Sequence, residues 1–161
     1  MAPSDDEKSA AELLERFRQT GLRLDRDGRW WHEGGRVEHA GMARAFSRWV
    51  DRLDDGRYVL RLDEKRYAYV EVEDAPLVAR SARVEGVGVR VWLSLSDETE
   101  EALDPATLAR RGGQLYCRAR GGRLPCRLAP QAVYALGDAL REEEGGVVLE
   151  IGGKRYAIAD E

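Results

Sequence analysis

Arginine side chains are concentrated in one short part of the sequence, where six arginines and no acidic residue occur between positions 110 and 127. Guanidinium groups match the geometry of phosphate and carboxylate groups, and an aromatic ring beside them can stack on a ligand. If the chain turns at Gly121-Gly122, one face of the hairpin carries Tyr116, Arg118, Arg120, Arg123 and Arg127. This pattern predicts a surface that binds a small anionic ligand or an acidic partner protein. The alternative is a solvated face that the acidic stretches 97–101 and 141–144 neutralise.

A second candidate site contains His32, one of only two histidines. With a turn at Gly34-Gly35, His32 and Trp30 share a face, and a histidine in a pocket can transfer protons near neutral pH. Glu73 and Asp74 end a later strand and are the candidate carboxylates of such a site. A small enzyme with a pocket near Trp30, His32, Glu73 and Asp74 is therefore the alternative to a binding protein. The plainer interpretation is a core histidine and a solvated acidic edge.

No recognised catalytic motif accompanies these residues. The sequence lacks a phosphate-binding loop, a dinucleotide fingerprint, a nucleophile elbow and zinc-ligand spacing. We therefore predict no catalytic residue, no cofactor and no metal. Cys117 and Cys126 fall opposite each other in the arginine hairpin, and two cysteines in a chain of this length are typical of buried thiols in a reducing cytoplasm.

The composition is that of a folded, well-solvated protein of 161 residues, with 43% apolar and 35% charged residues. The net charge of -4 argues against a general nucleic-acid binder. Apolar runs are too short for a membrane span, and the acidic N-terminus does not have the pattern of a signal peptide. We predict a cytoplasmic protein, and a homodimer formed through exposed sheet edges is a third hypothesis.

The pattern before residue 22 predicts a helix over 1–21, because Ser4 and Glu7 form a capping box and apolar residues then follow at helical spacing. Residues 22–80 read as a first unit with a strand and hairpin, a helix over 39–56 and a second hairpin. Met42, Ala45, Phe46, Trp49, Val50 and Leu53 form the expected inner face of that helix.

Residues 81–161 read as a second unit, preceded within that range by a connecting hairpin. It has a hairpin, a helix over 129–144 and a last hairpin. The tetrapeptide Lys-Arg-Tyr-Ala occurs at 65–68 and again at 154–157, so we predict an internal repeat. Turns at Asp63-Glu64 and Gly152-Gly153 would point Tyr67 and Tyr156 into the core. The predicted fold class is α+β, with two repeated ββαββ-like units, largely antiparallel sheets and a preceding N-terminal helix.

The first half of the sequence resembles the bacterial DUF1285 family. Gly28 and Trp30 match a Gly-x-Trp hairpin, Tyr58 and Leu60 match a Tyr-x-Leu strand, and residues 72–76 match a Val-Glu-Asp-Ala-Pro segment. Leu77 departs from the phenylalanine that usually follows, and residues 61–63 replace the usual Thr-Pro-Val. The resemblance implies a fold of repeated α/β motifs and a link to signalling, and it supplies no catalytic residues. We therefore expect a non-catalytic binding or regulatory module in signal transduction.

Overall fold

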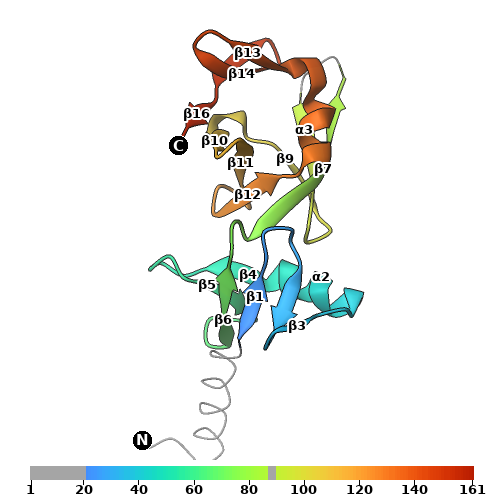
Figure 1. The fold of residues 1–161 in the computed structure, drawn as a ribbon, viewed down its shortest axis with the longest axis vertical. Coiled ribbons are helices and arrows are strands. Elements are labelled where there is room, and N and C mark those ends of the chain that lie inside the picture. Colours follow the sequence, from blue (N-terminus) through green and yellow to red (C-terminus); the bar gives the residue numbers. More distant parts are fainter. Residues whose placement is uncertain (1–20, 87–89) are drawn as a thin grey trace, which may run out of the picture. The chain divides into compact units, whose positions relative to one another are not determined.

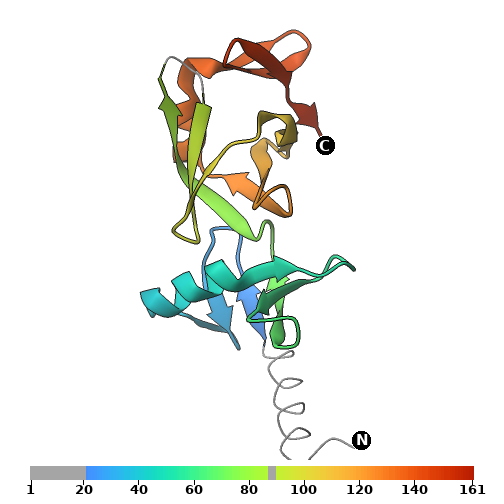
Figure 2. The same cartoon turned by 180° about the vertical axis from the view of Figure 1, so that it is seen from behind.

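The structure is a computed structural model, and it describes residues 21–86 and 90–161. The predicted N-terminal helix before Gly21 lies outside the described residues. The chain divides into two compact units, residues 1–76 and 77–161, which we treat separately. Figures 1 and 2 show the ribbon from opposite sides.

The described part of the first unit, from residue 21 onward, contains one sheet and one helix. Its six strands lie in the order β3-β2-β1-β6-β5-β4, and all neighbours are antiparallel except β1 and β6, which are parallel. The elements are β1 (Leu22–Leu24), β2 (Trp30–His32), β3 (Gly35–Arg36), α2 (Ala40–Trp49), β4 (Val50–Arg52), β5 (Tyr58–Arg61) and β6 (Tyr67–Val72).

Trp30 joins the helix to the sheet of this unit. Its ring is buried and meets Phe46 of α2 edge to face, with ring centroids 5.5 Å apart. Its indole N–H donates to the hydroxyl of buried Ser47, 2.9 Å away. Figure 2 shows α2 crossing the sheet on this side. The core therefore includes one polar contact that fixes where the helix sits.

Helix α2 is shorter than the pattern predicted, and its buried face is rotated. The helix ends at Trp49, because Val50 adopts an extended conformation and begins β4. Ser47 is the fully buried helical residue, whereas Met42 is 49% exposed and Trp49 is 40% exposed. The predicted inner face was thus wrong for Met42 and Trp49.

The first Lys-Arg-Tyr-Ala segment has a different strand register from the predicted one. Leu60 lies opposite Ala68, and Arg61 lies opposite Tyr67. The cause is the Asp63 side chain, which accepts hydrogen bonds from the backbone of Lys65 and Arg66 and widens the loop. Because side chains alternate along a strand, this one-residue shift places Tyr67 on the face opposite Leu60. The turn predicted at Asp63-Glu64, which would have paired Leu60 with Tyr67, was therefore wrong.

The second unit contains a mixed sheet and a smaller antiparallel one. The seven-stranded sheet has the order β16-β10-β11-β12-β7-β8-β9, with β7 parallel to β12 and β10 parallel to β16. The second sheet is β13-β14-β15. The elements are β7 (Leu77–Glu85), β8 (Arg90–Leu95), β9 (Glu100–Ala102), η1 (Pro105–Thr107), β10 (Ala109–Arg111), β11 (Gln114–Ala119), β12 (Leu124–Leu128), α3 (Pro130–Leu136), η2 (Gly137–Ala139), β13 (Leu140–Glu143), β14 (Gly146–Ile151), β15 (Lys154–Ala157) and β16 (Ala159–Asp160).

The core of the second unit lies where α3 packs on β7 and β12. Leu77, Leu124 and Leu136 are almost completely buried there. Pro130 occupies the first turn of α3, and the helix ends at Leu136 because Gly137 adopts a positive φ of 50°. The predicted helix over 129–144 is therefore much shorter, and residues from Leu140 onward form β13.

Strands account for 50% of the described residues and helices for 17%, so the fold is mostly β and the predicted α+β class was wrong. The predicted ββαββ units were wrong as well. In the first unit a turn at residues 25–29 separates β1 from β2, so three strands precede α2. In the second unit β7, β8 and β9 belong to the same sheet as β10, β11 and β12 rather than forming a separate connecting hairpin.

Two predicted hairpins have the observed register. Cys117 lies directly opposite Cys126 in β11–β12, and Leu149 lies opposite Tyr156 in β14–β15. Both hairpins turn at a glycine pair with positive φ, which is the geometry that a tight turn favours. Among the described residues, no helix is long and apolar enough to cross a membrane.

Candidate functional site

A pocket of about 310 Å³ lies within the second unit. Strand β8, the segment from β9 to η1 and the β14–β15 hairpin supply its walls. The lining residues are Arg90, Val91, Ala102, Leu103, Pro105, Ile151, Gly152, Lys154 and Tyr156. They come from three separate parts of the sequence, so only the fold brings them together.

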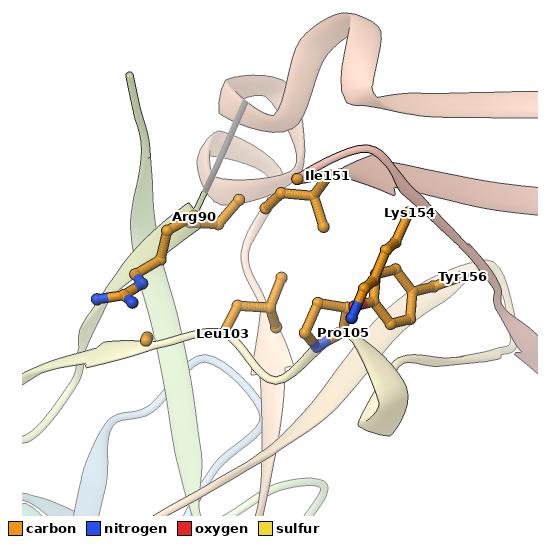
Figure 3. A pocket seen from close by; sticks show the side chains of 9 residues that line it. Arg90, Leu103, Pro105, Ile151, Lys154 and Tyr156 are labelled. Atoms are coloured by element: carbon orange, nitrogen blue, oxygen red, sulfur yellow. The ribbon is translucent and has the colours of Figure 1, made fainter. Parts of the chain in front are cut away.

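The pocket combines apolar walls with one inward-pointing cation. Val91, Leu103 and Ile151 are buried and form its apolar surface. Figure 3 shows the Lys154 side chain extending toward Pro105 and the ring of Tyr156. The guanidinium group of Arg90 points away from the pocket in the same view, so Arg90 contributes its aliphatic stem.

The acids beside this hairpin pair with a different cation. Glu143 and Glu150 both contact the guanidinium group of Arg155, and none of the lining residues is acidic. Cross-strand pairing explains this separation, because Arg155 lies opposite Glu150 on one face while Lys154 is paired with Ile151 at the turn. The pocket therefore has an exposed positive charge next to its apolar walls, an arrangement that suits an amphipathic anion.

Sequence reasoning did not find this pocket. The repeated Lys-Arg-Tyr-Ala motif is its one local signal, and we use that motif only to predict an internal repeat and the direction of its tyrosines. The turn predicted at Gly152-Gly153 is confirmed by the register of β14–β15. The same register also places Lys154 and Tyr156 on the pocket wall, beside residues of β8 and β9 that no sequence pattern links to them.

The residues of the predicted arginine surface on the β11–β12 hairpin are not all exposed to solvent. Arg118 and Arg123 are exposed, whereas Arg127 is buried and Tyr116 is only 9% exposed. The guanidinium group of Arg111 stacks on the Tyr116 ring, 4.3 Å from its centroid. The ring is thus already covered by a cation of the chain itself.

Arg120 is neutralised by the acidic stretch that follows β8. Its Nη2 donates to Asp97 Oδ2 at 2.9 Å, and its backbone N–H donates to Glu101 at 2.9 Å. Burial of Asp97 disfavours its charge, but hydrogen bonds from Thr99 and Arg120 outweigh burial and lower the pKa of Asp97. The alternative sequence interpretation, neutralisation by residues 97–101, is therefore confirmed for Arg120.

The residues of the second predicted site differ in burial. Trp30 is buried against α2, whereas His32 is exposed at the end of β2. Glu73 accepts hydrogen bonds from the Arg23 side chain and from the backbone of Arg26. These contacts connect the end of β6 to β1 and the loop after it, so Glu73 has a structural role.

Asp25 is the carboxylate that organises this region, and the sequence interpretation overlooked it. It is 9% exposed and accepts hydrogen bonds from Trp31 Nε1 at 2.8 Å and from the backbone of Asp27 and Arg29 at 2.9 Å. Burial opposes its ionisation, but these hydrogen bonds dominate and lower the pKa of Asp25. The Asp-x-Asp-Gly spacing of the 25–28 turn was the available signal.

Cys117 and Cys126 are free and buried, as predicted. The neighbouring Cys117 thiol and burial together raise the pKa of Cys126 well above its ordinary value. A thiol with a raised pKa is a poor nucleophile, so these residues act as small apolar side chains. In the described parts of the chain, no group of three or more histidine, cysteine or acidic side chains is arranged to hold a metal ion.

Comparison with known proteins confirms the resemblance to the DUF1285 family. Residues 15–75 match the N-terminal domain of that family, a domain of unknown function. The crystal structure of a DUF1285 family protein from Silicibacter pomeroyi DSS-3 has a TM-score of 0.71 and 23% identity, covering 86% of this chain and 79% of that chain. The crystal structure of a DUF1285 family protein from Shewanella baltica OS155 has a TM-score of 0.61 and 21% identity, and the match covers 73% of this chain and 90% of that chain. No curated protein matches the chain. The shared fold assigns no activity, because the family's function is unknown.

Proposed function

We propose that the chain is a non-catalytic binding module that takes a small amphipathic anion in the pocket under the β14–β15 hairpin. The observation that carries this proposal is the amino group of Lys154, which points into a pocket with apolar walls and no acidic lining residue. Lys154 is exposed, so solvent screens its charge, and its attraction for a carboxylate or phosphate needs the support of the apolar walls beside it.

The walls favour a ligand with an apolar part next to its charge. The volume of about 310 Å³ is at the lower end of the range for small-molecule sites. Leu103 and Ile151 offer an apolar surface, and the Tyr156 ring offers a face on which a flat group can stack. A hydrogen bond to a charged group contributes about 1.5–3 kcal/mol, which alone supports only weak binding. The apolar part must supply the rest.

Phenylacetate and its neutral isostere phenylacetamide test the charge requirement. We expect phenylacetate to bind in isothermal titration calorimetry and phenylacetamide to bind about tenfold more weakly or not at all. Lys154→Glu should abolish phenylacetate binding, and Lys154→Arg should retain most of it. Lys65→Glu is the matched control, because Lys65 holds the same place in the other Lys-Arg-Tyr-Ala segment, in the first unit.

Equal binding of phenylacetate to the Lys154→Glu variant and the unaltered protein would contradict the proposal, as would equal binding of the two compounds. Circular dichroism of each variant separates a binding defect from loss of folding, since Lys154 is exposed at a turn and its substitution should leave the fold intact.

A second surface for an acidic partner is favoured by the exposure of Arg118 and Arg123 on the β11–β12 hairpin. Here a double substitution of Arg118 and Arg123 to glutamate is the suitable test, because Arg120 is bound to Asp97 and its replacement would disturb folding. Binding of heparin, as a polyanion probe, should weaken in this variant and with added salt. Unchanged retention on heparin would reject the surface.

We propose that the protein acts in the cytoplasm as a regulatory module. The link to signalling comes from the family resemblance. The two free, buried thiols support a reducing compartment. A binding module of this kind would report the level of its anionic ligand to a partner.

A further inference from the structure

Strand β15, which supplies part of the pocket wall, is also an edge of its three-stranded sheet. In the described part of the second unit, β14 is the only strand that pairs with it. The Ile158 N–H donates to the Val147 carbonyl at 2.9 Å, and hydrogen-bonded pairs alternate with other pairs in an antiparallel ladder. The backbone groups of Ala157 and Arg155, one and three residues before Ile158, therefore point away from β14 to the open edge.

The side chains of β15 divide between the two faces of the hairpin. Lys154 and Tyr156 line the pocket, whereas Arg155 lies on the opposite face and contacts Glu143 and Glu150. Because side chains alternate along a strand, a chain laid beside β15 would direct every second side chain to the pocket side. An added strand thus has access both to unused backbone groups and to the apolar walls.

The positive charge of the pocket lies at the start of this edge. Lys154 is exposed and is paired with Ile151 at the turn, and none of the lining residues is acidic. A polypeptide that runs antiparallel to β15 would end beside Lys154, where its terminal carboxylate meets the cation. Solvent screens an exposed cation, so hydrogen bonds along the edge are needed to add to its attraction. Strand addition and capture of a terminal carboxylate are both established modes of peptide recognition.

We propose that the amphipathic anion of this pocket is the free C-terminus of a partner polypeptide, added antiparallel to β15. Its carboxylate pairs with Lys154, and its last side chain is apolar and enters the pocket beside Leu103 and Ile151. Its preceding residues pair with the backbone of Arg155 and Ala157. This inference rests on the proposed function, because it names the ligand class of the same pocket. An isolated aromatic or fatty acid would leave the open edge of β15 unpaired.

Fluorescence anisotropy with the full chain and a labelled peptide of about six residues tests the proposal. The peptide alternates threonine and valine and ends in leucine with a free carboxylate. We expect saturable binding that becomes about tenfold weaker, or is lost, when the carboxylate is amidated or the leucine is replaced by glycine. Methylation of one alternate set of peptide nitrogens should abolish binding, and methylation of the other set should leave it intact, because only one set faces β15.

The variant Ala157→Pro separates the edge from the pocket. The Ala157 N–H does not pair with β14, and proline is tolerated in an edge strand at such a position, so the fold should persist. Peptide binding should fall about fivefold or more, whereas phenylacetate should bind as it does to the unaltered protein. Lys154→Gln should weaken binding of both ligands, and Lys154→Arg should retain it. Arg141→Gln is the matched control, because it removes a positive charge from the same sheet outside the pocket lining.

The inference is overturned if the free and amidated peptides bind equally, if both methylated peptides bind equally, or if folded Ala157→Pro retains full peptide affinity. Phenylacetate binding that requires Lys154, without any peptide binding, would reject the C-terminal ligand and leave the proposed function intact. Full binding of both ligands by Lys154→Gln would reject the anion pocket and this inference together. Circular dichroism shows whether each variant is folded, and the methylated peptides decide the question on the unaltered protein.

Discussion

The contact between Asp97 and Arg120 should contribute strongly to the stability of the second unit. The Asp97 side chain is 3% exposed and that of Arg120 is 25% exposed, with 2.9 Å between the paired atoms. Asp97 also accepts hydrogen bonds from the backbone and the hydroxyl of Thr99. Asp97→Asn keeps the shape but removes the charge, so the ion pair with Arg120 is lost and a carboxylate acceptor is replaced by a neutral amide. We expect a loss of about 2–4 kcal/mol in the free energy of unfolding at neutral pH.

The pH dependence gives this prediction a second, independent part. The pKa of Asp97 is lowered in the folded chain, from 3.8, because its hydrogen bonds outweigh the effect of burial. A group with a lowered pKa contributes stability above its unfolded pKa and loses that contribution as the pH falls. The difference in stability between the unaltered protein and Asp97→Asn should therefore be full above about pH 5 and shrink progressively below pH 4.

Urea unfolding of protein labelled with fluorotryptophan measures both parts. The chain has four tryptophans, and Trp92 is the one within residues 77–161, so its fluorine signal reports the second unit alone. Glu98→Gln is the control, because the Arg80–Glu98 pair lies in the same unit, is exposed and should contribute little. A loss below about 0.5 kcal/mol in Asp97→Asn, or a difference that stays constant into acid, would refute the reasoning.

Two further predictions concern buried polar groups. Ser47→Ala removes the acceptor of the Trp30 indole N–H, so thermal unfolding should show the first unit destabilised by about 1–2 kcal/mol, and an unchanged midpoint would mean that the indole finds another acceptor. Cys117 and Cys126 are buried and the pKa of Cys126 is raised, so an aromatic disulfide reagent should label neither thiol in the native protein and both in urea. Rapid labelling of the native protein would show that this sheet opens readily.

Two of the three hairpins predicted to turn at a glycine pair have the predicted register, whereas the turn predicted at Gly34-Gly35 was wrong, because His32 lies opposite Gly35 and the chain turns at Glu33-Gly34. At Gly121-Gly122 and Gly152-Gly153 the positive φ angles favour a two-residue turn, and this turn fixes the register of the two strands. The alternation of apolar residues then indicates which face of each hairpin is buried. The loop before Tyr67 was not predictable in this way, because Asp63 uses its side chain to cap two backbone amides. A local hydrogen bond of this type competes with the tight turn and leaves no trace in hydrophobic periodicity.

Long-range contacts limited the prediction of helices and of the site. The apolar spacing of α2 indicates a helix correctly, but it assigns Met42 and Trp49 to the core, because spacing alone does not show which side the sheet covers. The arginine pattern was visible in the sequence, yet its neutralisation depends on Asp97, which lies 23 residues away from Arg120. The pocket depends on the fold bringing Lys154 to the same cavity as Leu103 and Val91, which are far from it in the sequence, and nothing in the sequence pattern indicates that proximity.

The most direct test of the anion pocket uses the two isoleucines of the chain, Ile151 and Ile158. Ile151 lines the pocket, whereas Ile158 is buried outside its lining, so methyl-labelled isoleucine gives one probe and one internal control. During a titration with phenylacetate, the account predicts a saturable shift of the Ile151 methyl signal, a nearly constant Ile158 signal and no comparable effect of phenylacetamide. A stationary Ile151 signal, or equal movement of both signals, would contradict it.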